Sequence, residues 1–349
     1  MPTTSACPDV AAKPACLDVA ATEWDLGEKI GEGTYGHVHA VKRRRTGEVA
    51  VFKRPAKVAP RRGITRHGLR ELALGALAHE NIIGLRGAAV EKVGKSDGLT
   101  IVLEHGGVDL DRRIRDARDA HTPLPARSVA CIMRQCVDAV AYLHRKWIMH
   151  RDLKPANVLL TGDPFDPAQP LVAKLVDFGL ARSFRAPPQP FAKVDARVVS
   201  LFWRAPELLL NLEYGPPVDV WSLGCILAEL VGGSILFKAG ERRAGASRVH
   251  VASGAPMDTD AEQLHEICDV LGGPADTWAD ARASSRRPQI PPKHEKEIRS
   301  ALNFRLEGGE ACGAISKRCL DLMTAMLSLE PSRRPMAREV ASHEYFSAA

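Results

Sequence analysis

The N-terminal part of the chain alternates between apolar and polar residues in short segments separated by turn residues, which predicts β-strands. The segments are "WDLGEKIGEG", "HVHAVKRR", "EVAVFKR", "LRGAAVEK" and "LTIVLEH". Residues 66–78 interrupt them with apolar residues at helical spacing. The apolar face of this helix would consist of Leu69, Leu72, Ala73 and Ala76. We therefore expect a mostly β lobe over residues 24–105.

Beyond residue 108 the apolar residues follow the period of an α-helix. Over residues 128–147 we expect a helix that begins behind Ser128, a residue type that commonly caps helix N-termini. Its apolar positions are Val129, Ile132, Met133, Cys136, Val140 and Leu143. The segment "VDVWSLGCILAELVGG" is apolar nearly all round, as a buried helix is, and "CLDLMTAMLSL" is amphipathic. A mostly α-helical lobe is expected over residues 108–346, with the boundary near Gly106–Gly107.

Three segments fall outside this pattern. Residues 1–23 contain proline and acidic residues where a signal peptide would need an uninterrupted apolar stretch, so we expect a flexible tail there. The segment "TGDPFDPAQPL" (residues 161–171) is rich in turn residues and separates two apolar strands. Residues 239–260 are polar and rich in small residues, which predicts a long surface loop.

Composition narrows the class of protein. Of the 349 residues, 45% are hydrophobic and 26% are charged, which is ordinary for a globular chain with a sizeable core. The net charge of +6 is too mild to require direct nucleic-acid binding, and we interpret the basic run "VKRRRTGE" as a solvated turn rather than a nuclear localisation signal. No apolar run has the length of a membrane span. The eight cysteines show no C-x-x-C spacing, which favours reduced thiols in an intracellular protein.

The stretch "IGEGTYGHV" has a G-x-G-x-x-G spacing between two predicted strands. Because it opens a hairpin and does not lead into a helix, it disfavours the dinucleotide-binding fold that shares this spacing. Glycines without a Cβ let backbone N–H groups lie close to phosphates, although glycine-rich hairpins without a ligand are about equally common. The candidate nucleotide-binding residues here are Ile30, Gly31, Glu32, Gly33, Thr34, Tyr35, Gly36, His37 and Val38.

Lys53 ends the apolar strand "VAVFK", and Glu71 follows on the predicted helix. A lysine at a strand end can be an ordinary surface residue whose stem covers apolar surface. Alternatively, an acidic partner on a helix can hold the lysine amine toward the α- and β-phosphates of a nucleotide. Lys53 and Glu71 are therefore candidate catalytic residues if they pair.

The segment "HRDLKPANVLL", followed by "VDFGL", is the strongest chemical signal in the chain. Asp152 is placed to accept a hydroxyl proton, and Lys154 offers a positive charge to a transferring phosphate. Asn157 and Asp177 supply the hard oxygen ligands that Mg²⁺ prefers. Phosphoryl transfer requires mainly positioning and charge neutralisation, and this set of residues provides both.

Together these motifs cover residues 24–346 and resemble the eukaryotic serine/threonine protein kinases, with Lys154 after "HRDL" favouring serine and threonine over tyrosine substrates. The resemblance implies an α+β fold of two lobes: a small β-rich N-lobe with one key helix, and a larger α-helical C-lobe, with an ATP-binding cleft between them. It implies ATP and Mg²⁺ as cofactors. It also adds Glu104 and Gly106, in the segment between the lobes, to the ATP-binding residues.

In such kinases a buried ion pair closes the C-lobe. Here it would join Glu207 of "WRAPELL" to Arg334 of "EPSRRP". Asp219 of "VDVWSLG" would anchor the backbone of the catalytic loop, which is the "HRDLKPAN" segment (residues 150–157).

Within the kinases, the chain is similar to the cyclin-dependent kinases. The similarity lies in "GLRELALGALAHENII", "DFGLAR", "VVSLFWRAPELLL" and the closing "HEYF". It implies a cyclin partner and protein substrates. It also implies that Val199 and Arg204 shape a pocket for a proline that follows the phosphorylated residue.

Several segments further resemble the Mediator-associated kinase that works with cyclin C. They are "GTYGHV", "KWIMHRDLKPANVLL", "TGDPFDPAQPL" and the insertion ahead of "EQLHEICDVLGGPADTWAD". This resemblance implies a cyclin C-like partner, other subunits of the Mediator kinase module, transcription-related substrates such as the RNA polymerase II tail, and a nuclear rather than a cytoplasmic location.

The expected activation segment contains neither threonine nor tyrosine between Asp177 and Glu207. Asp195 stands where most cyclin-dependent kinases carry an activating phosphothreonine. Three arginines hold that phosphate in relatives, and the matching positions here are Arg70, Arg151 and Arg182. A carboxylate would supply one charge where a phosphate supplies about two. The alternative is that Asp195 is a solvated loop residue.

Two departures separate the chain from this branch. Its helix reads "ITRHGLRE", and Leu103 stands at the back of the expected ATP pocket, where the family usually has phenylalanine. The alternatives are a cell-cycle or other cyclin-dependent kinase, and a non-catalytic pseudokinase scaffold. The presence of Lys53, Asp152 and Asp177 disfavours the scaffold.

Overall fold

The computed structural model describes residues 23–33, 36–54, 64–75, 77–93, 96–184, 200–240, 259–307 and 315–347. The chain divides into two compact units: residues up to 78 together with 84–105 form the first, and residues 79–83 together with those from 106 onward form the second. The first is built mainly of strands and the second mainly of helices, as the hydrophobic pattern predicts. Among the described residues, no helix combines the length and the apolar character needed to cross a membrane.

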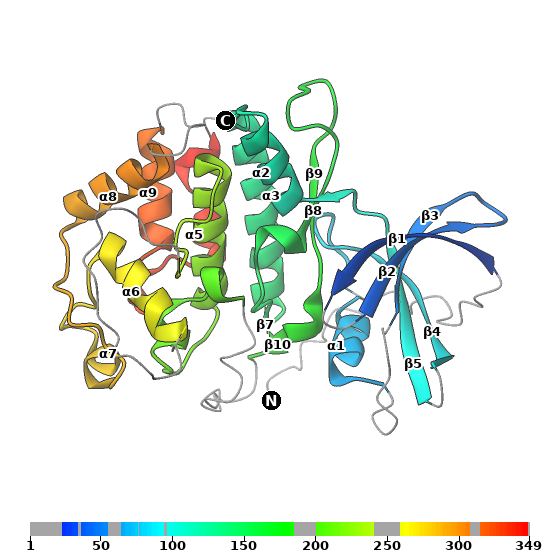
Figure 1. Ribbon diagram of the computed structural model, residues 1–349, viewed down its shortest axis with the longest axis horizontal. Coiled ribbons are helices and arrows are strands. Elements are labelled where there is room, and N and C mark those ends of the chain that lie inside the picture. The colour runs from blue at the N-terminus through cyan, green and yellow to red at the C-terminus, as the bar shows by residue number, and fades with distance from the viewer. Residues whose placement is uncertain are drawn as a thin grey trace, which may run out of the picture. The chain divides into compact units, whose positions relative to one another are not determined.

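The first unit is a five-stranded antiparallel sheet with the strand order β1-β2-β3-β5-β4 (Figure 1). Its elements are β1 (Trp24–Gly33), β2 (Gly36–Arg43), β3 (Val49–Arg54), α1 (Arg66–Leu74), β4 (Leu85–Val93) and β5 (Ser96–Glu104). Successive side chains of a strand point to opposite faces of the sheet, so the alternating apolar residues bury one face. Its core cluster consists of Trp24, Val41, Ala50, Phe52 and Val102, none of them more than 5% exposed.

Helix α1 ends at Leu74, earlier than the expected residue 78. The chain leaves the helix at Gly75, where a Cβ would lie 2.8 Å from the Cβ of Leu85, so this close approach requires glycine. At the other end the Thr65 side chain accepts a hydrogen bond from the Gly68 N–H and caps the helix.

The apolar face of α1 is only partly covered. Leu69 is 49% exposed and Ala73 is also exposed, whereas His67 and Glu71 are buried. Leu72 is half-buried, and Ala76 lies outside the described residues. Helical spacing shows that apolar residues share a face, but it does not show what covers that face.

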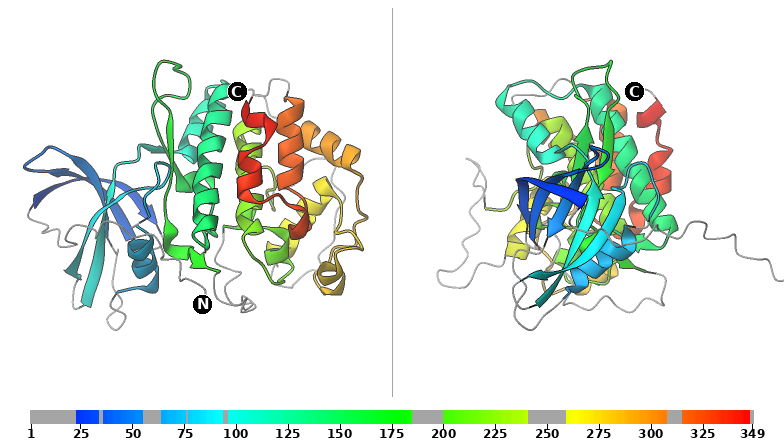
Figure 2. Two further views of the ribbon diagram at one scale, coloured as in Figure 1. Left: turned by 180° about the vertical axis from the view of Figure 1, so that it is seen from behind. Right: turned by 90° about the vertical axis from the view of Figure 1, so that its right-hand side faces the viewer.

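The second unit is mostly helical, and α3 lies beside α5 and α10 within it (Figure 2). Its α-helices are α2 (Leu110–Asp119), α3 (Ala126–Arg145), α4 (Pro206–Leu209), α5 (Pro217–Gly232), α6 (Thr259–Leu271), α7 (Ala279–Ala283), α8 (Glu295–Glu307), α9 (Lys317–Met326) and α10 (Ala337–Ala341). The strands are β6 (Val108–Asp109), β7 (Ile148–Met149), β8 (Val158–Thr161), β9 (Val172–Leu175) and β10 (Arg182–Ser183). They form a three-stranded sheet, β6-β8-β9, and a two-stranded sheet, β10-β7. The 3-10 turns are η2 (Pro155–Asn157), η3 (Phe178–Leu180), η5 (Leu201–Trp203), η6 (Pro331–Arg333) and η7 (Glu344–Ser347).

Helix α5 is buried on nearly all sides, which confirms the prediction from its apolar sequence. A Cβ at Gly224 would lie 2.9 Å from the Cδ2 of Leu327, so the missing side chain lets α5 approach the end of α9 closely. The ring of Trp221, on this helix, stacks on the ring of Phe237, which follows the helix, with the ring centres 5.8 Å apart. This apolar core fixes the segments that carry the polar residues of the site.

Ser128 does not cap α3, contrary to our expectation. The helix begins at Ala126, and Ser128 is a buried residue of its first turn whose hydroxyl donates a hydrogen bond to the Pro164 carbonyl. Pro164 belongs to the turn-rich segment that joins β8 to β9, and this segment does separate two strands, as predicted. Gln135 holds the same segment, because its Nε2 donates to the Leu171 carbonyl at 2.9 Å.

The loop expected over residues 239–260 is shorter at its C-terminal end. Thr259 and Asp260 form the first turn of α6 rather than the end of the loop. Residues 241–258 lie outside the described residues.

Candidate active site

Asp219 fixes the backbone of the catalytic loop. Its Oδ2 and Oδ1 accept hydrogen bonds from the backbone N–H groups of His150 and Arg151, each at 2.9 Å, and His144 Nε2 lies 2.9 Å from Oδ2. Burial on its own would raise the pKa of Asp219, but the interactions with His144, His150 and the Arg151 N–H together outweigh burial and lower it. The carboxylate is therefore held in its charged form, which is the form that anchors two N–H donors.

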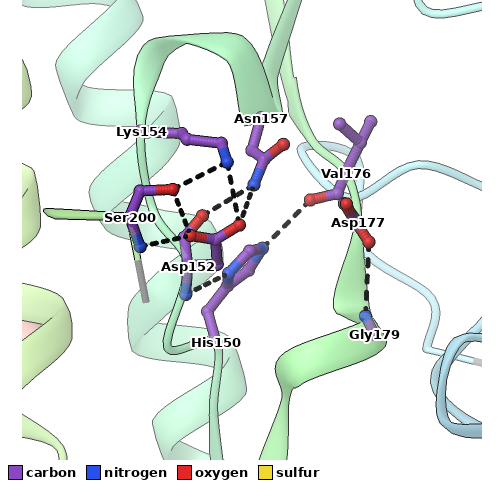
Figure 3. A network of polar contacts seen from close by, with 8 residues as sticks. All are labelled: His150, Asp152, Lys154, Asn157, Val176, Asp177, Gly179 and Ser200. Carbon is purple, nitrogen blue, oxygen red and sulfur yellow. Dashed lines mark hydrogen bonds and ion pairs between the residues drawn. The ribbon is translucent and has the colours of Figure 1, made fainter. Parts of the chain in front are cut away.

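Asp152 is the centre of a network of polar contacts in the second unit (Figure 3). Its Oδ2 accepts a hydrogen bond from Asn157 Nδ2 at 3.0 Å and lies 3.1 Å from Lys154 Nζ. Its Oδ1 accepts from the Ser200 hydroxyl at 2.9 Å and from the Ser200 N–H at 3.2 Å. The side chain is buried, yet three residues orient it. This is the arrangement that a carboxylate base needs.

The sequence motifs assign no role to Ser200. Besides bonding to Asp152, the Ser200 hydroxyl accepts a hydrogen bond from Lys154 Nζ at 2.8 Å. It therefore links the base to the lysine that would face a transferring phosphate. The available signal was a hydroxyl residue four positions before Arg204 of the "RAPE" motif.

Asn157 and Asp177 are the candidate ligands for a metal ion. Asn157 donates from Nδ2 to the Asp152 backbone carbonyl at 2.7 Å, which fixes its amide and leaves Oδ1 as the acceptor end (Figure 3). Asp177 has a left-handed backbone (φ 63°), and its carboxylate accepts from the Gly179 N–H at 3.4 Å. An amide oxygen and a carboxylate fit Mg²⁺, a hard cation that prefers oxygen ligands. His150 Nε2 lies 3.1 Å from the Val176 carbonyl and links the two segments.

Asp195 lies outside the described residues, but the three arginines expected around it are described. Two of them, Arg151 and Arg182, lie in the second unit. Arg151 is buried and donates hydrogen bonds to the Leu180 carbonyl and to the Tyr214 hydroxyl. Arg182 lies on β10. The third arginine, Arg70, lies on α1 of the first unit.

Arg204 makes an ion pair with Asp260 at the start of α6. The pKa of Arg204 is lowered because burial outweighs the attraction of Asp260. The preceding residue, Trp203, is held by Glu229, whose Oε2 accepts its indole N–H at 3.1 Å, and by Ser222, whose hydroxyl donates to its carbonyl. Val199, the other residue of the expected proline pocket, lies outside the described residues.

In the first unit, Lys53 and Glu71 form the expected pair. Lys53 Nζ lies 2.9 Å from Glu71 Oε1, and the two side chains are 19% and 5% exposed. Lys53 lies near the end of β3, opposite Val38 on β2 and Ile101 on β5. The sheet therefore fixes the lysine, and α1 supplies its carboxylate.

The glycine-rich stretch forms the β1–β2 hairpin, as predicted. Gly31 pairs with Val38, Glu32 with His37, and Gly33 with Gly36, while Ile30 is 48% exposed. Thr34 and Tyr35 lie outside the described residues. Gly36 has a φ of 155°, and no helix follows the motif, in keeping with a phosphate-covering hairpin and not with a dinucleotide-binding turn.

The two further candidate ATP-binding residues, Glu104 near the end of the first unit's sequence and Gly106 where the second's resumes, have different environments. Glu104 ends β5, and its Oε1 accepts a hydrogen bond from the Gly84 N–H at 2.8 Å, so its carboxylate is already engaged. Leu103 beside it is buried. A Cβ at Gly106 would lie 2.6 Å from Leu159 Cδ1, so a larger residue there would have to displace the leucine side chain.

An oriented carboxylate base, an adjacent lysine, two oxygen ligands for a metal and a lysine–glutamate pair together define a phosphotransferase. Comparison with known proteins agrees, because the family described as protein kinase domain matches residues 24–346. The cyclin-dependent kinase B2-1 of Oryza sativa subsp. japonica is 30% identical over 325 residues, which cover 92% of this chain and 88% of the relative. The serine/threonine-protein kinase SSN3 of Phaeosphaeria nodorum is 31% identical over 344 residues, which cover 91% and 74%.

The chain therefore belongs to the protein kinase family, as a serine/threonine kinase of the cyclin-dependent type. The cell division control protein 2 homolog 3 of Trypanosoma brucei brucei is similar to the same extent, with 31% identity over 325 residues. The expected α+β, two-lobed kinase fold is confirmed.

Proposed function

We propose that this kinase is activated by a cyclin, with a cyclin C-like protein favoured, and phosphorylates serine or threonine followed by proline in transcription-related proteins such as the RNA polymerase II tail. Such substrates place its proposed action in the nucleus, with other subunits of the Mediator kinase module as further partners. The observation that carries the transfer step is the oriented Asp152 carboxylate with Lys154 and Ser200 beside it.

In the proposed reaction, Asp152 accepts the proton of the substrate hydroxyl as that oxygen attacks the γ-phosphate of ATP. Lys154 lies close enough to Asp152 to stabilise charge on the transferring group. Asn157 and Asp177 would hold Mg²⁺, which neutralises phosphate charge when bound. Lys53, fixed by Glu71, would bind the nucleotide phosphates under the glycine-rich hairpin.

The exposed side of α1 supports a protein partner. Leu69 is 49% exposed and Ala73 is exposed on a helix that otherwise positions Glu71 for Lys53. Covering apolar side chains on this helix would stabilise its position and therefore the Lys53–Glu71 pair. A cyclin is the occupant that the kinase type implies.

The test is turnover of Mg²⁺-ATP by the purified chain with a panel of cyclins that includes a C-type cyclin. Two peptides that differ only in having Pro or Ala after the target serine report the substrate preference, and Asp177→Asn is the inactive control. We expect turnover with the C-type cyclin and a preference for the Ser-Pro peptide. Turnover with a cell-cycle cyclin alone would favour that branch, and no turnover with any cyclin would favour a scaffold.

We also propose that Asp195 replaces the activating phosphothreonine. Support comes from its place in the sequence and from the presence of Arg70, Arg151 and Arg182 at the positions that hold the phosphate in relatives. Since a hydrogen bond to a charged group is worth about 1.5 kcal/mol, Asp195→Ala should lower kcat of the cyclin complex about tenfold. Ser183→Ala, in the same segment, should change kcat little. Full activity of Asp195→Ala would contradict the proposal.

A further inference from the structure

Arg151 connects three segments of the second unit through one buried guanidinium. Its backbone is left-handed, with a φ of 67°, and the residue is 5% exposed. Its Nε donates to the Leu180 carbonyl and its Nη1 donates to the Tyr214 hydroxyl oxygen, both at 2.7 Å. The catalytic loop, the turn that follows Asp177 and the loop between α4 and α5 therefore meet at this side chain.

The loop that presents Tyr214 is held at both ends. The Leu212 N–H donates to the Glu207 carbonyl at 2.8 Å. At the other end, the Pro217 carbonyl accepts a hydrogen bond from Arg334 Nη1 at 3.0 Å. Arg334 is itself paired with the Glu207 carboxylate at 2.7 Å, with both side chains buried. The phenol of Tyr214 is consequently carried by a fixed loop.

We propose that Tyr214 is a positioning residue for phosphoryl transfer. Its hydroxyl oxygen holds the Arg151 guanidinium, and the guanidinium in turn binds the Leu180 carbonyl. Leu180 lies three residues after Asp177, the candidate metal ligand, and Arg151 directly precedes Asp152. The contact therefore fixes the segment of Asp177 relative to Asp152. The role concerns the chemical step, so it goes beyond the proposed function and does not depend on the identity of the cyclin or the substrate.

A phenol oxygen suits this role because it is neutral. A hydrogen bond to a charged donor is stronger than one between neutral groups. At the same time, a neutral acceptor does not neutralise the positive charge of Arg151. Tyr214 can therefore orient the guanidinium whatever the state of the activation segment.

The test is Tyr214→Phe, which removes only the hydroxyl, measured in whichever complex of the full chain is active. We expect kcat to fall about tenfold, because a bond to a charged group is lost, while KM for ATP changes by less than about twofold. The melting temperature should stay within about 2 °C. The matched control is Tyr142→Phe. Tyr142 is a half-buried tyrosine on α3 whose hydroxyl makes no hydrogen bond to the described residues, so its loss should leave kcat unchanged.

A second measurement separates positioning from simple loop support. In an Arg151→Lys background the forked guanidinium is absent, so Tyr214→Phe should lower the residual kcat no further. An unchanged kcat for Tyr214→Phe alone would overturn the proposal. So would an additional loss in the Arg151→Lys background, or a loss of activity matched by a lower melting temperature.

Discussion

Glu229 is an acidic residue in the last turn of α5, a helix that is otherwise almost wholly apolar and buried. It is 3% exposed, and its Oε2 accepts the indole N–H of Trp203. Burial raises the pKa of Glu229 to about 7 from its ordinary 4.5, although the Trp203 bond opposes the rise. The folded chain therefore keeps this carboxyl protonated over a pH range in which the unfolded chain ionises it.

Because the pKa is raised on folding, the stability that Glu229 contributes is present in full below pH 4.5 and is lost as pH rises through about 7. The free energy involved is on the order of 3 kcal/mol. Glu229→Gln should therefore gain stability relative to the unchanged chain as pH rises from 5 to about 8, as measured by melting temperature at each pH. Asp280→Asn, an exposed site on α7, is the control. Identical pH profiles for Glu229→Gln and the unchanged chain would contradict this.

The sequence identified the candidate catalytic residues that lie together in one short motif. Asp152, Lys154 and Asn157 lie in a single segment, and their spacing is typical of one function. Ser200 and Tyr214 were not identified because they lie far from this segment in the chain. Ser200 contacts Asp152 from 48 residues away, and Tyr214 contacts Arg151 from 63 residues away. Such contacts exist only after folding.

At the scale of the element, α1 shows what an amphipathic pattern leaves open. The pattern predicted a helix here with its apolar residues on one face, but it did not show that the structure buries Glu71 for Lys53 and leaves Leu69 exposed. Burying a glutamate is acceptable here because it is paired with a lysine.

A charge on the exposed side of α1 should prevent a cyclin from covering it. Leu69→Glu should weaken cyclin binding at least about tenfold, as expected for an apolar anchor at an interface, and should lower kcat in parallel at fixed cyclin concentration. Leu26→Glu changes a comparably exposed leucine on β1 and is the control. Binding measured by calorimetry decides the matter, and equal affinities for the two variants would show that the cyclin does not use this face.

The start of α3 illustrates the same limit for capping. Ser128 has the residue type of a helix cap, but its hydroxyl bonds to the Pro164 carbonyl, 36 residues further along the chain. Local propensity is weaker than a specific tertiary partner, so the helix begins two residues earlier, after Pro125. The segment between β8 and β9 is therefore fixed to α3 by side chains that a pattern of turn residues does not reveal.

At the scale of the whole molecule, the division into a strand-rich and a helix-rich unit could be predicted because the hydrophobic period changes near residue 106. The family resemblance implied the ion pair between Glu207 and Arg334, and the structure confirms it. Nη1 and Nη2 of Arg334 each donate a hydrogen bond to the Glu207 carboxylate at 2.7 Å. Physical pattern alone does not pair two residues so distant in the chain.

Breaking this pair from one side should be costly, because a buried charge is left unpaired. Glu207→Gln and Arg334→Met should each lower the free energy of unfolding of the second unit by about 3–5 kcal/mol, and the double variant by less than the sum. Urea unfolding measures all three. Arg112→Met removes one partner of an exposed pair and should cost less than about 0.5 kcal/mol. Strict additivity in the double variant would show that the two side chains do not act as a pair.

The Arg334 fork also has a consequence for the order of folding. Besides Glu207 it binds the carbonyls of Pro217, Ser328 and Leu329, and it does so from 127 residues beyond Glu207. During synthesis the ribosome must therefore release residue 334 before the loop that carries Tyr214 can be fixed at both ends. Contacts of such long range form late and slowly. The loop that carries Tyr214 is thus fixed late, and a nascent chain that stops short of Arg334 lacks this support.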